Sequence, residues 1–404
     1  MTTSEKRNVL LGVTGSIAAY KAVEFARLLV SRGYDVRVIM SAAAQKFVTP
    51  LTFQSVTGKA VMTDLWESNS AENIEHIEIA DWADVFVIAP ATADVIAKIT
   101  TGHADSPILA TALATKAPLV IAPAMNVNMY EHEATQENIL KLRVRGVSFV
   151  DPEEGALACG WNGAGRLADI WDIFYHTRRA LTKGDLAGKR VLVTTGPTRE
   201  PIDPVRFISN RSSGKMGTAI AREAFCRGAD VTVIHGPLKQ LELPTSIESL
   251  PVVTAQEMHD TVLEHAFRTD DPFDFVIMVA AVADFRPADM AEHKIKKATA
   301  ADSIPMVANP DILAALGKKR GTQQKPTLVG FAVETGEHEE LMAELRRKLE
   351  SKSIDLIVGN LADDAFDLDT NRTWLVNKNG KQEEIAATFK WRVANKILDA
   401  ALKV

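Results

Sequence analysis

Two side chains of the sequence could carry out proton transfer. Cys159 lies in the glycine-rich segment LACGWNGAGRLAD (157–169), which also contains Arg166. A structural cysteine usually lies on an apolar face, whereas a thiol in a glycine-rich loop is accessible to ligands and available for chemistry, and the flexibility of the loop suits a lid. His76 lies in NIEHIEIADWAD, and an imidazole titrates near working pH and can act as a base. A surface histidine at the start of a helix is the alternative interpretation of His76.

The segment GVTGS (12–16) has the composition of a phosphate-binding turn. It lies between an apolar run and a helical pattern, so backbone N–H groups and the positive end of the helix dipole would face a bound anion. A dinucleotide fold would require GxGxxG here and an acidic residue at the end of the second strand, but that strand ends at Ser41. Ser41 can donate to phosphate. A glycine turn that only connects strand and helix is the alternative.

Two further segments follow buried strand candidates. They are PATAD (90–94) and APAMN (122–126), and ligands of open α/β sheets bind at such strand ends. The second segment could also be a plain turn in which Asn126 satisfies its own backbone.

In the second half of the chain, NRSSG (210–214) opens a helical pattern at Lys215. Its amide, hydroxyl and backbone donors at a helix N-terminus are suited to an anion. The segment is not a P-loop, because Ser209 replaces the required glycine and Met216 replaces the Ser or Thr after the lysine. A serine-rich surface loop with helix caps is the alternative.

Asp284 comes directly after a buried strand candidate and precedes a polar, lysine-rich segment without periodicity (287–305). We expect this segment to be a mobile flap between a strand and a helix. It contains HKIKK (293–297), whose lysines could clamp a triphosphate or could be only a solvated run of charge. Lys348 and Lys352 lie on one face of a charge-rich helical pattern, at positions i and i+4.

The hydrophobic patterns that position these segments predict two α/β domains. A strand, a glycine turn, a helix and a second strand open the chain at Asn8, and the same order recurs from Arg190 after the polar linker TKGDLAGKR. We therefore predict two doubly wound Rossmann-like domains, 1–189 and 190–404, the first flavodoxin-like and the second nucleotide-binding. Strands are expected at 85–89, 119–122, 275–279, 327–331 and 356–358, and helices at 170–181, 215–227 and 337–351. Asn379-Gly380 predicts a hairpin that adds an antiparallel edge.

The composition limits the kind of protein. The chain has 404 residues, of which 46% are hydrophobic and 24% are charged, so it can bury the cores of two domains. Its net charge of −6 gives no general attraction to nucleic acids or anionic membranes. Its two cysteines form neither a disulfide framework nor a thiolate zinc site, and no apolar run reaches about 18 residues. We expect a soluble cytoplasmic protein and assign no metal ligands.

The first half carries a specific combination of motifs: GVTGSIAAYK, a lone histidine before a helix, PATA, PAMN and ACGxxGxGR. Together they resemble the homo-oligomeric flavin-containing cysteine decarboxylases, among them the phosphopantothenoylcysteine decarboxylases. Asp94 stands where that family commonly has Asn, and an anion there would alter the hydrogen bonding of the flavin. The resemblance implies that FMN binds Gly15, Ser16, Ser41, Ala91, Thr92, Ala93 and Asp94.

The resemblance also implies catalytic roles. The flavin would oxidise the thiol end of the substrate so that CO₂ can leave, while His76 would manage the thiol proton and Asn126 would hold the carboxylate. Cys159 would give a proton to the product, and Met125 and Arg166 would contact the substrate. The product would be 4′-phosphopantetheine.

In the second half, SNRSSGKMG, AAVADFRP, KIKK, NPDI and GFAVET resemble the phosphopantothenate–cysteine ligases. With both halves in this order, the resemblance is to the bifunctional proteins of coenzyme A biosynthesis and covers essentially the whole chain. It implies a ligase that uses CTP and Mg²⁺, in which Asn210 acts on an acyl-cytidylate, Lys294 neutralises developing charge and Arg206 contacts substrate. The residues that it assigns to CTP are Asp284, Lys294, Asn309, Pro310, Asp311, Ile312, Phe331, Lys348 and Lys352.

The resemblance further implies an assembly. The decarboxylase domains would form trimers with the flavin at a subunit interface and the ligase domains would pair, which gives a closed homo-oligomer such as a dodecamer. The expected partners are small-molecule substrates, not nucleic acid or membrane. Two other functions are compatible with the predicted α/β folds. An NAD(P)-dependent oxidoreductase lacks GxGxxG and the acidic strand end in both halves, and a non-catalytic flavin-fold scaffold would need neither His76 nor Cys159.

Overall fold

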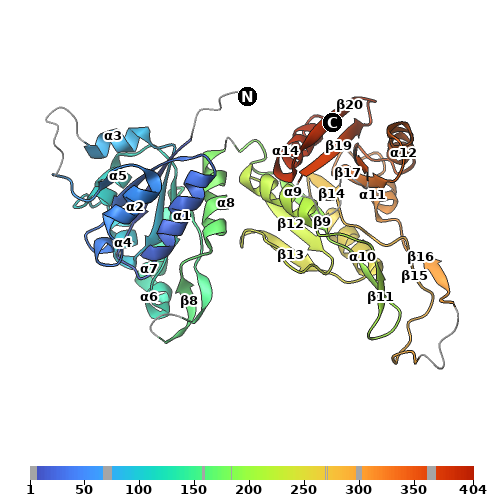
Figure 1. Cartoon of the computed structure of the whole chain (residues 1–404), viewed down its shortest axis with the longest axis horizontal. Coiled ribbons are helices and arrows are strands. Elements are labelled where there is room, and N and C mark those ends of the chain that lie inside the picture. The colour runs from blue at the N-terminus through green and yellow to red at the C-terminus, as the bar shows by residue number, and fades with distance from the viewer. Residues whose placement is uncertain are drawn as a thin grey trace. The chain divides into compact units, whose positions relative to one another are not determined.

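The computed structural model describes residues 7–66, 75–156, 160–182, 184–268, 270, 272–296, 303–361 and 370–404. The chain divides into two compact units, Met1–Thr182 and Lys183–Val404 (Figure 1). Each unit contains a mainly parallel sheet with helices on both of its faces. The predicted class, two doubly wound Rossmann-like α/β domains, is confirmed.

The sheet of the first unit is parallel throughout and has the strand order β3-β2-β1-β4-β5-β6. Without the two-residue edge strand β3, the other five strands have the predicted flavodoxin-like order. With it, the sheet has the 3-2-1-4-5-6 order of dinucleotide-binding folds. The strands are β1 (Asn8–Val13), β2 (Asp35–Met40), β3 (Val61–Met62), β4 (Val85–Ala91), β5 (Leu119–Pro123) and β6 (Ser148–Phe149).

Helices cover both faces of this sheet, and its central strands β1 and β4 are accordingly apolar and buried along almost their whole length. On one face α1 packs against α2 and α8, and on the other α5 packs against α3 and α4. An antiparallel ribbon, β7 (Glu153–Ala156) with β8 (Asn162–Arg166), precedes α8. The helices are α1 (Ala19–Ser31), α2 (Pro50–Thr57), α3 (Glu75–Trp82), α4 (Ala93–Thr101), α5 (Pro107–Ala114), α6 (Val127–Glu131), α7 (Glu133–Val144) and α8 (Ile170–Leu181), with a 3₁₀ turn at Ala44–Lys46.

The sheet of the second unit has eight strands in the order β13-β12-β9-β14-β17-β18-β19-β20. The first six are parallel, and β19 and β20 form the antiparallel edge predicted from Asn379-Gly380. Gly380 has a φ of +80°, a conformation that glycine adopts without strain. The strands are β9 (Arg190–Thr195), β12 (Asp230–His235), β13 (Glu248–Pro251), β14 (Phe275–Met278), β17 (Thr327–Glu334), β18 (Leu356–Leu361), β19 (Thr370–Asn377) and β20 (Gln382–Phe389).

Two short antiparallel ribbons project from this unit. One pairs β10 (Arg199–Pro201) with β11 (Phe207–Ser209), and the other pairs β15 (Phe285–Pro287) with β16 (Met306–Ala308). The second ribbon is the stem of the predicted flap. The helices are α9 (Lys215–Cys226), α10 (Ala255–Ala266), α11 (Ile312–Arg320), α12 (His338–Ser351) and α14 (Lys390–Ala401).

Arg227 ties the beginning of the second unit to its end. The guanidinium is largely buried, and its Nη2 lies 2.5 Å from Oδ2 of Asp185 while its Nη1 lies 2.9 Å from Oδ1 of Asp399 in α14. The backbone N–H of Leu186 also donates to the carbonyl of Arg227. The segment that follows Lys183 therefore packs with the second unit, although the sequence analysis put residues up to 189 in the first domain. Among the described residues, no helix has the length and apolar character needed to cross a membrane.

Candidate functional sites

A cavity of about 660 Å³ opens in the first unit, above the carboxyl ends of β1, β4 and β5. The strand order reverses between β1 and β4, which is where open α/β sheets bind ligands. Segments that are far apart in the sequence meet here. The lining residues are Gly15, Ser16, Ile17, Ala18, Tyr20, Lys21, Thr92, Ala124, Met125, Asn126, Met129, Gly165, Arg166 and Leu167.

The glycine turn lies directly against the loop that follows β2. A Cβ atom on Gly15 would lie only 2.4 Å from the Cβ of Ala43, so no larger residue fits without displacing that loop. The same loop contains Ser41, whose Oγ accepts a hydrogen bond from the N–H of Ala44 at 3.1 Å. Ser41 thus lies next to the turn but does not line the cavity.

Thr14 connects the glycine turn to the PATA segment. Its side chain is fully buried, and Oγ1 donates to the carbonyl of Pro90 at 2.7 Å and accepts from the N–H of Thr92 at 3.1 Å. Thr92 then caps α4 by accepting from the N–H of Val95. Thr14 was not assigned from the sequence, although it stands within the GVTGS segment.

The rest of the PATA segment does not line the cavity. Ala91 is buried in β4 and accepts a backbone hydrogen bond from Ala124, and Ala93 begins α4. Asp94 is exposed, and its Oδ2 lies 3.3 Å from Nζ of Lys98. The hydrogen bond that the Lys98 ammonium group donates to Asp94 raises the pKa of Lys98. The carboxylate of Asp94 is thus directed to this lysine and not into the cavity.

Met125, Asn126 and Arg166 come together on the opposite wall. The N–H of Met125 donates to the carbonyl of Gly165, and a Cβ on Gly165 would lie 2.3 Å from the Met125 oxygen, so the two backbones approach closely. Asn126 Oδ1 accepts from the N–H of Asn128 and caps α6, as its interpretation as a turn residue required. Arg166 is exposed, with Nη2 3.4 Å from Oε2 of Glu153.

Of the two proposed proton carriers, only His76 lies among the described residues. His76 is half-buried in the first turn of α3 and does not line the cavity. Figure 1 shows α3 well apart from α6 and β8, which carry the opposite wall. Cys159 lies outside the described residues.

Two cavity residues in α1 were not predicted from the sequence. Tyr20 and Lys21 lie in its first turn, which contains no acidic residue. The ammonium group of Lys21 adds to the positive end of the helix dipole, so this wall favours an anion. Tyr20 and Lys21 could have been predicted, because they end the segment GVTGSIAAYK and follow the glycine turn by about one helical turn.

In the second unit, the predicted nucleotide residues lie in two groups. Asn309 donates its N–H to the carbonyl of Asp284 and its side-chain amide to that of Ala283, while its Oδ1 accepts from Arg286. Pro310 and Asp311 follow, and Asp311 caps α11, which begins at Ile312. This first group lies at the carboxyl end of β14.

The second group consists of two lysines, Lys348 within α12 and Lys352 directly after it. Lys352 Nζ lies 3.0 Å from Oδ2 of Asp311, so these two predicted residues are in contact. Lys348 Nζ lies 2.6 Å from Oε1 of Glu334, at the end of β17. Phe331 is half-buried within the same strand. Without a ligand, both lysines are therefore paired with carboxylates.

Asn210 and Arg206 lie on either side of β11. Asn210 Nδ2 donates to the carbonyl of Val282 at 2.9 Å, which joins the serine-rich loop to the segment after β14. Arg206 Nη2 donates to the carbonyl of Ile295 in the flap at 2.7 Å. Lys294 is exposed beside that contact, whereas Lys297 lies outside the described residues. Asp203, which binds Arg206, was missed from the sequence.

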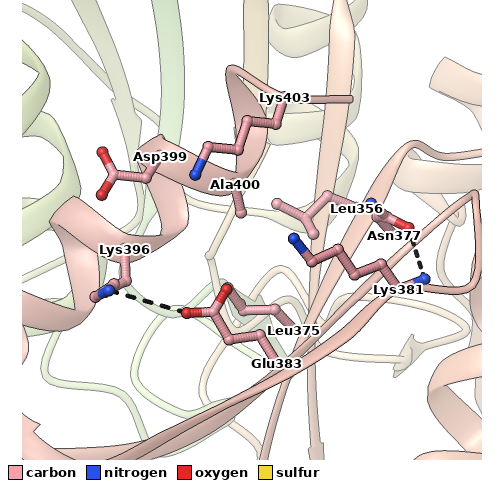
Figure 2. A pocket seen from close by; sticks show the side chains of 9 residues that line it. All are labelled: Leu356, Leu375, Asn377, Lys381, Glu383, Lys396, Asp399, Ala400 and Lys403. Carbon is pink, nitrogen blue, oxygen red and sulfur yellow. Dashed lines mark hydrogen bonds and ion pairs between the residues drawn. The ribbon is translucent and has the colours of Figure 1, made fainter.

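A second, much smaller cavity of about 60 Å³ lies between β18, the β19–β20 hairpin and α14 (Figure 2). Lys381, Lys396 and Lys403 surround it, and Lys396 Nζ lies 4.0 Å from Oε1 of Glu383. The cavity is at the amino end of β18, opposite the sheet edge with Asp284, and it contains none of the predicted residues. Among the described residues no group of three His, Cys, Asp or Glu side chains could hold a metal ion.

The comparisons with known proteins define the class of each unit. Residues 1–182 match the family model described as flavoprotein, and residues 186–404 match the one described as DNA/pantothenate metabolism flavoprotein C-terminal domain. The chain therefore joins a flavoprotein domain to a pantothenate-metabolism domain.

Curated relatives match both units together. The coenzyme A biosynthesis bifunctional protein CoaBC of Bacillus subtilis is 44% identical over 97% of this chain and 96% of its own length, and that of Vibrio vulnificus is 43% identical over 89% and 88%. A crystal structure of the C-terminal domain of a CoaBC protein is 37% identical and covers 53% of this chain and 94% of that domain, with a TM-score of 0.44. The chain belongs to the family of coenzyme A biosynthesis bifunctional proteins, as its motifs indicated.

Proposed function

We propose that the chain catalyses two consecutive steps of coenzyme A biosynthesis. The second unit condenses 4′-phosphopantothenate with cysteine at the expense of CTP, and the first unit decarboxylates the resulting 4′-phosphopantothenoylcysteine to 4′-phosphopantetheine with FMN as cofactor. The observation that carries the proposal is the cavity of the first unit, which gathers the glycine turn, the PATA segment and the PAMN segment around one space.

The cavity fits a flavin mononucleotide. Its volume of about 660 Å³ is within the usual range of cofactor sites. Gly15, Ser16 and the start of α1 suit the phosphate, because N–H groups and the helix dipole favour an anion there. Thr92 would contact the ring system, with Ser41, Ala91, Ala93 and Asp94 supporting the two loops. FMN, when bound, supplies the oxidation of the cysteinyl thiol and the return of hydride to the product.

The side chains of the chain itself position the substrate and move protons. The Asn126 amide holds the carboxylate that leaves as CO₂, and Met125 and Arg166 contact the rest of the substrate. His76 takes the thiol proton, and Cys159 protonates the carbon next to the one that receives hydride. Lys21 lies at the rim of the cavity, where its ammonium group suits the phosphate of the substrate.

His76 reaches this cavity from a neighbouring subunit. Within one chain α3 and the cavity are apart, but both are flanked by exposed apolar side chains, Ile77 and Leu113 on α3 and α5, and Ile17, Tyr20 and Met129 at the cavity. Two different surfaces that fit each other form a ring when the rotation closes. We therefore propose trimers of the first unit, joined through pairs of the second.

The ligase reaction requires activation of the 4′-phosphopantothenate carboxylate, because direct attack of an amine on a carboxylate would have to expel oxide. The carboxylate of 4′-phosphopantothenate attacks the α-phosphorus of CTP and pyrophosphate leaves, after which the amine of cysteine attacks the acyl carbon and CMP leaves. Lys294 neutralises the charge that develops on the phosphates, and Asn210 and Arg206 hold the acyl-cytidylate. The residues that bind CTP are those of the two groups described above: Asp284, Asn309, Pro310, Asp311, Ile312, Phe331, Lys348 and Lys352.

A Mg²⁺ ion at this site would neutralise charge on the triphosphate. Magnesium in nucleotide sites is held by phosphate oxygens and water with one or two protein carboxylates, so a dedicated cage is not required. Asp284 is the exposed carboxylate at the carboxyl end of β14 and fits this role.

The experiment that tests the proposal uses the purified full chain. A flavin absorption band near about 450 nm is expected, together with pyrophosphate release from CTP in the presence of 4′-phosphopantothenate and cysteine, and CO₂ release from 4′-phosphopantothenoylcysteine. A nicotinamide-dependent oxidation without a flavin band would instead favour an oxidoreductase. A flavin band without either reaction would favour a non-catalytic scaffold.

A further inference from the structure

The flap is attached to the body of the second unit at one well-defined point. The turn between β10 and β11 contains Asp203 and Arg206, and both bind Ile295 of the flap. We call these three residues the flap anchor. The N–H of Ala291 also donates to the carbonyl of Ile202 in the same turn, at 3.0 Å.

Asp203 is the centre of the flap anchor, and its two oxygens have separate partners. Oδ1 accepts from the backbone N–H groups of Val205 and Arg206 at 2.8 and 2.9 Å, which closes the turn. Oδ2 accepts from Nε and Nη2 of Arg206 at 2.9 and 2.6 Å, and from the N–H of Ile295 at 3.2 Å. The side chain of Asp203 is fully buried. Burial opposes the charge, but the hydrogen bonds from Val205, Arg206 and Ile295 outweigh it and lower the pKa of the carboxyl.

Asp203 and Arg206 together bind both the N–H group and the carbonyl group of Ile295. Its N–H binds Asp203 and its carbonyl accepts from Arg206 Nη2 at 2.7 Å. Lys294 immediately precedes Ile295, is exposed, and makes no ion pair within the described residues. The Nη1 group of Arg206 likewise makes no bond there, and its side chain is 47% exposed. Arg206 is thus paired directly with Asp203, and the exposed Lys294 is tied to the same carboxylate through the backbone of the residue that follows it.

We propose that Asp203 is a positioning residue of the ligase reaction, which fixes Lys294 and Arg206 relative to each other before an anionic substrate binds. This inference rests on the proposed ligase function. The carboxylate fixes the guanidinium through charge-assisted bonds and the flap backbone through the N–H of Ile295. Since a misplacement of about 1 Å can cost about 10²-fold in rate, loss of this preset arrangement is expected to slow the ligase reaction.

Asp203→Asn separates the two functions of the side chain, which are to close the turn through Oδ1 and to bind Arg206 and Ile295 through Oδ2. The remaining amide oxygen can still accept from Val205 and Arg206, because Asn closes such turns as Asp does. The NH₂ group, however, would replace Oδ2 and face the donors of Arg206 and Ile295. Asp185→Asn is the matched control, since Asp185 also binds an arginine of the same unit through two hydrogen bonds but lies at the linker.

The first test needs no activity. In hydrogen exchange of the unliganded full chain, the peptide containing Ile295 is expected to exchange at least about tenfold faster in Asp203→Asn than in the wild type and in Asp185→Asn. Equal exchange in all three proteins would overturn the anchor. This result stands even if the chain uses a different nucleotide.

The second test is a double-mutant cycle on pyrophosphate release with CTP. We expect Asp203→Asn to lower turnover by roughly 10- to 100-fold and Lys294→Gln by about 10²–10³-fold, with the double variant slower than Lys294→Gln by much less than the factor that Asp203→Asn costs alone. Effects that multiply would mean that Asp203 does not act through Lys294, and would overturn the proposal. Decarboxylation by the same proteins is expected to be unchanged. A wild type that releases no pyrophosphate would refute the ligase function and leave the exchange result intact.

Discussion

Thr14 holds together the two loops that line the cavity of the first unit. Its hydroxyl uses both its hydrogen and a lone pair, and its partners Pro90 and Thr92 lie 76 and 78 residues further along the chain. A buried hydroxyl with both functions satisfied fixes the distance between the glycine turn and α4. The fit of the cofactor therefore depends on a residue that does not itself line the cavity.

Replacing Thr14 tests this dependence. Thr14→Val keeps the shape but leaves the N–H of Thr92 without its acceptor, which costs about 1–3 kcal/mol. We expect the Kd for FMN to rise about tenfold, measured by the quenching of flavin fluorescence. Thr14→Ser retains the hydroxyl and should bind FMN like the wild type. Equal weakening in both variants would contradict the role of the hydroxyl.

His76 is expected to act in proton transfer and not in cofactor binding. His76→Asn should abolish CO₂ release from 4′-phosphopantothenoylcysteine, because the amide cannot accept the thiol proton. The flavin band and pyrophosphate release should remain, since the cavity residues and the second unit are unchanged. Normal CO₂ release by the variant, measured manometrically or by a coupled assay, would remove His76 from the mechanism.

At the scale of elements, the long apolar strands and the periodic helices were predictable, and the short ribbons were not. Helix α8 has the predicted bounds 170–181, and α9 and α12 differ from the predicted bounds by one residue at one end. The ribbons β7–β8, β10–β11 and β15–β16 have three to five residues per strand, too few for a pattern, and β8 reads NGAGR. Their pairing comes from tertiary contacts that a single sequence does not display.

The same reason explains which site residues were missed. Gly15 and Asp284 are recognisable from their position at a strand end, whereas Asp203 stands in PIDPVR, which reads as an ordinary turn. Its partner Ile295 lies 92 residues away. Contacts at such separations follow from the fold, so residue type and spacing could indicate the loops but not the bonds between them.

Helix α8 contains a buried histidine that makes stability depend on pH. Burial, with a smaller contribution from the charge of Arg179, lowers the pKa of His176 to about 4. The unfolded chain, with a pKa of about 6.5, binds more protons between these values, so this contribution is full above pH 6.5 and is lost as pH falls towards 4. Between pH 7 and pH 5 we expect a loss of about 2 kcal/mol in the free energy of unfolding of the first unit.

Urea unfolding of the full chain at the two pH values measures this loss, with the transition of the first unit followed by its flavin signal. His176→Gln should reduce the loss, because the amide does not titrate. His103→Gln is the control, since His103 is exposed. The same pH dependence in all three proteins would exclude His176 as its source.

At the scale of the whole molecule, the proposed trimer requires that a neighbour cover the face formed by α3 and α5. Leu113 on α5 and Leu140 on α7 are both 63% exposed and provide a matched pair. Leu113→Asp is expected to lower the mass in solution and the flavin retained after gel filtration, because a charge is costly in a buried interface. Leu140→Asp should leave both unchanged. Light scattering coupled to chromatography gives the mass, and a similar response of the two variants would argue against this face.

The contact of Arg227 with Asp185 and Asp399 has a consequence for how the second unit can be rebuilt. The Arg227 guanidinium binds both Asp185, near the start of this unit, and Asp399 in its last helix, α14. The two ends of the unit are therefore close to each other on its surface. Domains whose ends are close tolerate circular permutation. A short glycine-serine bridge from Val404 to Gly184, with new termini opened between Asn379 and Gly380 at the tip of the β19–β20 hairpin, should therefore yield a folded ligase unit. Circular dichroism would show whether the permuted chain keeps its secondary structure, and pyrophosphate release would show whether it keeps its activity.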